Sequence, residues 1–173
     1  HLDSDFRHIG LMHSDDEGKT WSFDRWVLTA NTVCFTEKYN PNNDLSIGQK
    51  FPLINLGSGD FSIYVDKEYI YIYYNIIYVN METEITERID VYVARSKIRE
   101  DGIISDFIKY YDGEFKEPGN FGKETPIVMD AWHAKVNKLV DYNVYLMSST
   151  KKINNGKYIP NVSGTIIQKQ VQF

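Results

Sequence analysis

Asp130, Trp132 and His133 bring a carboxyl group, an indole ring and an imidazole ring together within one short segment that follows the apolar residues 126–129. The flat face of an indole can stack on the apolar face of a sugar ring, while carboxyl and imidazole groups can bind its hydroxyl groups. These three residues therefore resemble the wall of a carbohydrate-binding site. A tryptophan packed in the core beside a hydrogen-bonded histidine is the plainer alternative.

Asp60 is a second carboxyl group with a distinctive position, because it opens a segment, 61–65, that turns apolar at once. We expect this carboxyl group at the end of a sheet, next to low-dielectric packing. The alternative is a turn carboxylate that caps backbone N–H groups. Two further acids, Glu117 and Glu124, lie in a glycine-containing loop, where a solvated charge is the default.

Metal and redox chemistry have little support in the sequence. The four histidines are scattered without HxH or HxxxH spacing, which disfavours zinc. Cys34 is the only cysteine, so an internal disulfide and a CxxC zinc site are both excluded. We therefore expect no cofactor, with calcium bound by carboxylates as the one alternative, although no EF-hand loop is present.

Composition narrows the class of protein further. The chain has 173 residues, of which 42% are hydrophobic and 25% charged, and this is typical of one globular domain. Its formal net charge is −5, with no basic cluster, which argues against nucleic-acid binding. No stretch approaches the roughly 20 apolar residues of a membrane-spanning helix.

The periodic segments predict β-strands, and no window predicts an amphipathic helix. Residues 69–78 place apolar or aromatic side chains on both faces of the expected strand, which is typical of an inner strand covered on both sides. Long irregular loops are expected at 36–50 and 114–124. The other expected strands are 8–13, 61–65, 89–94, 107–111, 142–147 and, more weakly, 165–173.

The most specific motif is the octapeptide that runs from Ser14 to Trp21 and fits the pattern Ser-x-Asp-x-Gly-x-Thr-Trp at every fixed position. Its residue types suit a tight corner between two strands. The Asp16 carboxylate can bind N–H groups of its own turn, Gly18 can adopt a positive φ, and Trp21 can fold back over the turn. We therefore expect this motif to be structural and not catalytic.

This motif resembles the Asp-box of sialidase-like β-propellers, and the resemblance extends over residues 9–147. In that range the chain is similar to the five-bladed β-propeller glycoside hydrolases of the arabinanase, xylosidase and fructosidase-like superfamily, or to a bacterial relative of them. The segments that carry the similarity are 14–21, 59–65, 71–74, 91–96, 109–115 and 117–122.

The resemblance implies antiparallel four-stranded blades. Asp60 and Asp130 occupy equivalent places 130 − 60 = 70 residues apart, so the chain would hold about two to three blades. We expect the end of one blade at 1–56, a second blade at 57–124 and the start of a third at 125–173. A partial propeller leaves open edges, so the remaining blades are expected in the rest of a longer chain or in another chain.

In that superfamily, carboxylates at the inner ends of the first strands of successive blades face one central pocket. The resemblance therefore implies a glycosidase in which Asp60, Asp130 and Glu117 are catalytic, with Glu124 as the alternative acid. Trp132 and His133 would bind the carbohydrate substrate. An exported bacterial protein, extracellular or periplasmic, is the expected setting.

Two other functions stay open. Phe61 stands where these enzymes usually carry a proline, and this favours a non-catalytic propeller that binds carbohydrate or protein. A structural β-rich interaction domain, in which the octapeptide is only a hairpin corner, is the third reading.

Overall fold

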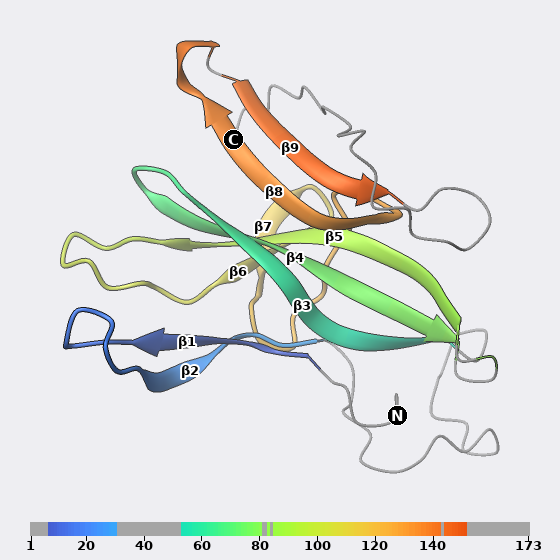
Figure 1. Cartoon of the computed structure of the whole chain (residues 1–173), viewed down its shortest axis with the longest axis horizontal. Coiled ribbons are helices and arrows are strands. Elements are labelled where there is room, and N and C mark those ends of the chain that lie inside the picture. Colours follow the sequence, from blue (N-terminus) through green and yellow to red (C-terminus); the bar gives the residue numbers. More distant parts are fainter. Residues whose placement is uncertain (1–6, 31–52, 81–82, 84, 143, 152–173) are drawn as a thin grey trace.

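The computed structural model describes residues 7–30, 53–80, 83, 85–142 and 144–151, and this part of the chain is built from antiparallel β-strands (Figure 1). The strands form a β1–β2 hairpin, a sheet with the order β3–β4–β5–β6–β7, and a β8–β9 hairpin. The prediction of an all-β, antiparallel fold is confirmed. The elements are β1 (Ile9–His13), β2 (Ser22–Leu28), β3 (Leu53–Val65), β4 (Tyr69–Asn80), β5 (Ile85–Lys97), β6 (Ile108–Tyr111), β7 (Glu114–Pro118), β8 (Ala131–Leu139), the 3-10 turn η2 (Val140–Tyr142) and β9 (Val144–Lys151).

Strand β4 lies at the centre of the fold, as its sequence predicts. Tyr71 and Tyr73 are buried on one face of the sheet, while Ile72 and Tyr74 are buried on the other. Because successive side chains of a strand point to opposite faces, both faces of the sheet need a cover here. The expectation of an inner strand packed on both sides is confirmed.

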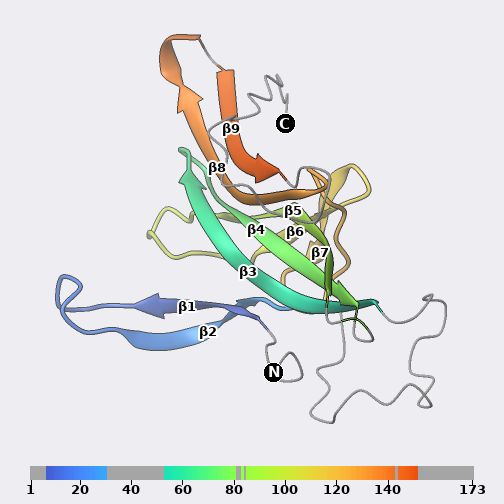
Figure 2. The ribbon, with the colours of Figure 1, turned by 45° about the vertical axis from the view of Figure 1, so that its right-hand side comes forward.

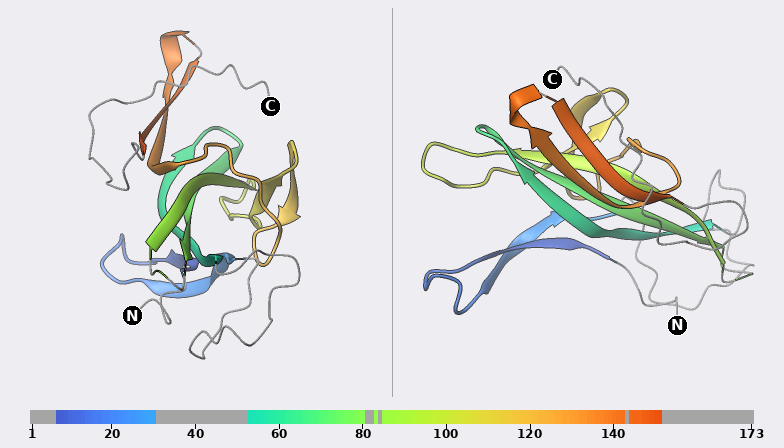
Figure 3. Two further views of the ribbon diagram at one scale, coloured as in Figure 1. Left: turned by 90° about the vertical axis from the view of Figure 1, so that its right-hand side faces the viewer. Right: turned by 45° about the horizontal axis from the view of Figure 1, so that its top comes forward.

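The two hairpins supply these covers, so the molecule has three layers (Figures 2 and 3). Ile9, Val27 and Leu28 of the β1–β2 hairpin pack on the face that carries Ile72 and Tyr74. On the opposite face, the β8–β9 hairpin buries a second cluster with Tyr71 and Tyr73, to which it contributes Ala131, Ala134 and Val136. Burial of apolar surface between these layers is the main stabilising contribution.

Strand β5 links the central sheet to the layer formed by the β8–β9 hairpin. It pairs with β6 only at Ala94 and Arg95. Three residues before Ala94 on the same strand, the Val91 N–H donates to the carbonyl of Val128 at 2.8 Å, and the Ile127 N–H donates to the carbonyl of Val91 at 2.8 Å. The segment that leads into β8 is thereby held beside β5, and this fixes where β8 begins.

The octapeptide forms the predicted corner between β1 and β2. Asp16 Oδ1 accepts the N–H of Thr20 at 2.8 Å, and its Oδ2 accepts the Thr20 hydroxyl at 2.6 Å. Gly18 has a φ of 83°, and its N–H donates to Ser14 Oγ at 2.8 Å. The indole N–H of Trp21 reaches back to the Gly18 carbonyl at 3.1 Å. The turn is therefore held by its own side chains.

Three strands, β2, β7 and β8, form where no strand was expected. All three belong to hairpins whose pairing contains register shifts, at Ile9/Gly10 and Leu11/Met12 for β2, at Lys109/Tyr110 for β7 and at Trp132/Lys135 for β8. A bulge adds a residue to one strand and so interrupts the alternation of apolar and polar positions. The period-two pattern, on which the prediction depended, is lost in such segments.

The boundaries of other elements also differ from the expectation. Asp60 does not open a strand, because β3 begins at Leu53 and carries Asp60 in its interior. The expected loop 114–124 starts with strand β7, and Tyr142 belongs to η2 and not to the following strand. The expected loop at 36–50, the expected strand at 165–173 and Cys34 lie outside the described residues.

No helix in the described part of the chain is long and apolar enough to cross a membrane.

Acid should weaken the β1–β2 corner through Asp16. The hydrogen bonds from the Thr20 hydroxyl and N–H lower the pKa of this carboxyl group from 3.8 to about 2. A depressed carboxyl pKa stabilises the folded state above the unfolded pKa, and this contribution disappears as the pH falls through the folded value. We expect it to be complete above about pH 4 and lost by about pH 2.

The measurement is an NMR titration of the Asp16 carboxyl group together with thermal unfolding between pH 2 and pH 5. Asp16→Asn should remove this part of the pH dependence, whereas the exposed Asp15→Asn, one residue away, serves as the matched control. An Asp16 titration midpoint near 4 would contradict the assignment.

Candidate functional site

Asp60 lies on a β-bulge of β3 and ties three segments of the chain together. Its φ is 42°, and the pairing of β3 with β4 shifts register between Gly59 and Ser62. One carboxylate oxygen, Oδ2, accepts Arg7 Nη1 at 3.0 Å and Trp132 Nε1 at 2.9 Å. The carboxyl group is thus shared between the segment before β1 and the start of β8, and 29% of it is exposed.

Asp130, directly before β8, and His133, the third residue of β8, have left-handed backbone conformations. Their φ values are 53° and 52°. Residues other than glycine adopt such values at a cost of order 1 kcal/mol or more, and they persist only where the surroundings hold them. Both side chains are exposed, so their conformations are not imposed by packing of these side chains in the core.

Two buried polar side chains hold this backbone in place. Asp90 Oδ1 accepts the N–H of Asp130 at 3.1 Å, and Asn75 Oδ1 accepts the N–H of His133 at 3.0 Å. The Asn75 amide also donates to the carbonyls of Asp90 and Ala131. Buried polar groups of this kind fix one geometry, because a misplaced partner would leave an unpaired polar atom in the core.

The tryptophan lies between these two anchored positions. Its ring packs partly against the cluster of Leu56, Ile77, Val79 and Ile89. The His133 ring lies 4.5 Å from it, centre to centre, at an interplanar angle of 36°. Trp132 is therefore fixed at its nitrogen by Asp60 and on its flank by the core, with the His133 ring beside it.

The carboxyl group of Asp90 is fully buried, and its pKa is raised. Burial is the main cause, although the Asp130 N–H and the Arg88 guanidinium act in the opposite direction. Arg88 Nε lies 2.7 Å from Oδ2, yet the N–H is not aligned with that oxygen and makes no hydrogen bond to it. Asp90 is inaccessible to a ligand, so it can act only by positioning Asp130.

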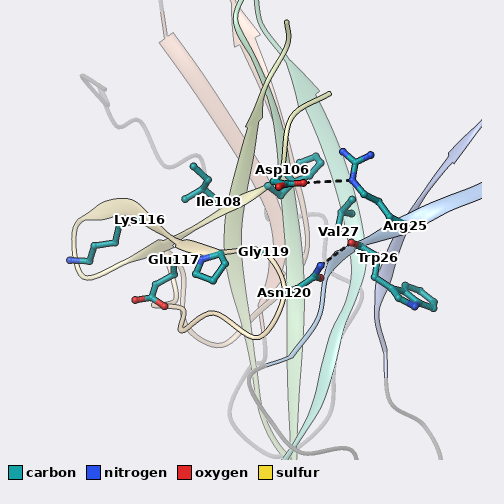
Figure 4. A pocket seen from close by; sticks show the side chains of 11 residues that line it. Arg25, Trp26, Val27, Asp106, Ile108, Lys116, Glu117, Gly119 and Asn120 are labelled. Carbon is teal, nitrogen blue, oxygen red and sulfur yellow. Dashed lines mark hydrogen bonds and ion pairs between the residues drawn. The ribbon is translucent and has the colours of Figure 1, made fainter. Parts of the chain in front are cut away.

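Glu117 lies in another part of the molecule. It belongs to β7, and Asp60 belongs to β3, which is the opposite edge strand of the same sheet. Its Oε2 accepts the N–H of Lys123 at 3.1 Å. Glu117 lines a cavity of about 580 Å³ between β2 and β6–β7, with Lys116 beside it and with Arg25 and Asn120 on the other side (Figure 4). Of the three acids expected to be catalytic, Asp60 is hydrogen-bonded to Trp132, Asp130 lies two residues before Trp132 in the chain, and Glu117 lies apart from both.

Glu124 differs from the expectation of a solvated loop charge. Only 8% of its side chain is exposed, and its Oε2 lies 2.8 Å from the ammonium group of the fully buried Lys109. The Tyr74 hydroxyl donates to the same oxygen at 2.5 Å. Burial and this carboxylate raise the pKa of Tyr74 well above its usual value. Lys109 also donates to the carbonyls of Thr29 and Gly122, so the group joins the end of β2 to the loop after β7.

The positioning residues Asn75 and Asp90, and the buried Lys109, were not identified from the sequence. Asp90 and Lys109 sit in alternating segments where a charged residue is normally the solvent-facing one. Their burial depends on the hairpins that cover both faces of the sheet, and the local sequence pattern does not show this. Among the described residues, no three His, Cys, Asp or Glu side chains are grouped so that they could hold a metal ion.

Comparisons of the chain with protein-family models, with curated proteins and with solved structures found no match.

Removing the carboxyl group of Asp90 should release the backbone at Asp130. Asp90→Ala leaves the partly buried N–H of Asp130 without its acceptor, which we expect to cost about 1 kcal/mol of unfolding free energy. Asp90→Asn keeps an amide oxygen near Oδ1 and should preserve this bond. Urea denaturation and hydrogen exchange of the Asp130 amide measure the two effects. Equal exchange rates in both variants would contradict the positioning role.

The buried ion pair gives a separate prediction. Lys109→Met leaves the Glu124 carboxylate buried without its ammonium partner, so we expect a loss of about 3–5 kcal/mol of unfolding free energy. Adding Glu124→Gln, which keeps an acceptor for the Tyr74 hydroxyl, should restore part of this loss. Lys116→Met, on the exposed side of β7, is the matched control. Denaturation in urea should show that the two substitutions are strongly non-additive.

Proposed function

We propose that this protein binds a carbohydrate at the surface formed by Asp60, Asp130, Trp132 and His133, as part of a glycoside hydrolase-like β-propeller. The observation that supports this most is the anchored geometry of the segment 130–133. Two strained residues are held by buried side chains on either side of a tryptophan, and backbone strain of this kind tends to occur at functional sites.

The chemistry of the four side chains suits a sugar. An indole offers an apolar face for the C–H groups of the ring, and the carboxylate and imidazole groups offer acceptors and donors for its hydroxyl groups. Because Asp60 and Asn75 fix the tryptophan and the backbone before any ligand arrives, little side-chain freedom would be lost on binding.

Hydrolysis is the reaction that this surface would carry out. Cleavage of a glycosidic bond requires one carboxylic acid, which protonates the leaving oxygen, and one carboxylate on the other side of the sugar. In our proposal Asp130, which projects into solvent, is the acid, and Asp60 is the carboxylate that attacks the anomeric carbon or activates water. Glu117 has no role in this scheme, since it lies on the opposite edge strand of the sheet.

A non-catalytic carbohydrate-binding module is the second candidate, and the contacts of Asp60 favour it. Oδ2 already accepts two N–H groups, from Arg7 and Trp132, which is the arrangement of a structural tie. In this alternative Asp60 fixes the tryptophan and the saccharide is bound without being cleaved.

The broader setting follows the same proposal. The three face-to-face sheets would be neighbouring blades, with further blades supplied by a longer chain or by another chain. A carbohydrate substrate suits a bacterial protein exported to the periplasm or the outside of the cell.

The test combines calorimetry with kinetics on the full chain. The probes are xylotetraose, cellotetraose and maltotetraose for binding, and a panel of aryl glycosides for turnover. If the protein is a hydrolase, Asp130→Asn should lower kcat by about 10²–10⁴-fold, with binding changed much less. Lys135→Met, an exposed substitution on β8, is the control that should change neither.

For the binding module, wild-type protein should bind a tetrasaccharide without turnover, and Trp132→Phe should raise Kd about tenfold, or roughly 1.4 kcal/mol. Absence of both saturable binding and turnover with every probe would overturn the proposed function.

A further inference from the structure

Arg95, on β5, is held by aromatic rings. Its guanidinium carbon lies 4.4 Å from the centre of the Tyr69 ring and 4.2 Å from the centre of the Phe115 ring. Tyr69 belongs to β4 and Phe115 to β7, so the two rings come from strands on opposite sides of β5. Rings that contact a guanidinium in this way fix its orientation, and the N–H groups around its edge remain as its donors.

Arg95 also differs from the other arginines in its charge balance. Arg7, Arg25, Arg88 and Arg99 each have an aspartate oxygen at 3.0 Å or less. Among the described residues, no aspartate or glutamate oxygen lies within 4.0 Å of a side-chain nitrogen of Arg95. The residue is partly exposed, so its positive charge lies within reach of a ligand.

Two further donors lie next to this guanidinium. Tyr71 pairs with Arg95 across β4 and β5, and burial raises the pKa of its hydroxyl, while a hydrogen bond from Arg95 acts in the opposite direction. Lys97 lies two residues beyond Arg95, so its side chain starts on the same face of the sheet. Lys97 is exposed, and it too has no carboxylate within 4.0 Å in the described part of the chain.

Asp66 is an acid whose charge reaches this face of the sheet. After burial and the hydrogen bond from Arg95, its carboxylate is the next contribution to the pKa of Tyr71, which it raises. Asp66 Oδ1 accepts the N–H groups of Glu68 at 2.8 Å and Tyr69 at 2.7 Å, so this carboxylate is used by the turn between β3 and β4. It therefore repels an anion from a distance but does not neutralise Arg95.

We propose that Arg95 and Lys97 bind an oxyanion, which is a carboxylate, sulfate or phosphate group of a ligand, at the edge of the guanidinium. The planar fork of an arginine can donate two parallel hydrogen bonds to such a group, and bonds between opposite charges are about twice as strong as neutral ones. Because the two rings already fix the guanidinium, little side-chain freedom is lost on binding. A neutral hydroxyl group would gain much less from the two cations. This inference does not depend on the proposed carbohydrate function, since it uses none of the residues of that surface.

An NMR titration of the full chain tests the proposal, with the Nε–H signal of Arg95 as the reporter. The probes are sodium phosphate, sodium sulfate and sodium acetate at about pH 7, where all three are ionised, with sodium chloride used to keep the ionic strength constant. We expect a saturable shift of the Arg95 signal, while the signals of Arg25 and Arg99, which already have aspartate partners, stay in place. Tighter binding of acetate assigns a carboxylate ligand, and tighter binding of phosphate or sulfate assigns a tetrahedral one.

The variants separate the contributions of the two cations. Arg95→Gln should raise the dissociation constant at least about tenfold, and Lys97→Met about threefold, as read from neighbouring backbone amide signals. Asp66→Asn, which keeps an oxygen for the turn, should lower it. Arg99→Gln is the matched control on the same strand-end region and should leave it unchanged. Circular dichroism checks that each variant keeps the wild-type fold.

Absence of a saturable Arg95 shift with all three anions in the wild-type protein would overturn the proposal, and this result does not depend on the folding of any variant. Equal shifts at Arg95, Arg25 and Arg99 would also overturn it, because they would reflect general screening of charge. An Arg95→Gln variant that is folded and binds as tightly as the wild type would do the same.

Discussion

The fold depends on the double-sided burial of β4. Its side chains are too apolar to leave either face in water, so a single sheet cannot be stable by itself, and the two hairpins are required as covers. This requirement explains the three-layer arrangement. It also determines where polar groups can be placed, because every polar atom between the layers must find a partner there.

Two groups of polar side chains lie between the layers, and they have different structural effects. On one side of the central sheet, Lys109, Glu124 and Tyr74 bind the end of β2 and the loop after β7, and this fixes the first layer to the second. At the start of the third layer, Asn75 and Asp90 bind the backbone of 130–133. The first group holds elements together, while the second holds an exposed segment in an unusual conformation. Only the second group, Asn75 and Asp90, lies next to exposed side chains that a ligand could contact.

Local patterns were sufficient where an element depends on its own residues. The strand β4 follows from its uninterrupted apolar composition, and the β1–β2 corner follows from Ser14, Asp16 and Gly18, whose bonds stay within the turn. Prediction failed where the outcome depends on distant partners. The bulges in the hairpins of β2 and β8 removed the alternation, and the burial of Lys109 and Asp90 arises from layers contributed by other segments. Of the candidate site, Asp60, Asp130, Trp132 and His133 were singled out from the sequence, whereas the residues that hold them, Arg7, Asn75 and Asp90, were not.

The connection of strands in sequence order has a consequence for how the chain folds. Each described sheet joins only neighbouring strands, so its pairing can form from local contacts, which is the quicker kind of step. Packing of the hairpins on the central sheet joins residues far apart in the chain and must come later. In that interval the tyrosine- and isoleucine-rich strand β4 is exposed on both faces, and segments of this composition readily form intermolecular cross-β structure. Packing of the hairpins therefore ends the stage of folding at which the chain is prone to aggregate, and it also stabilises the final state.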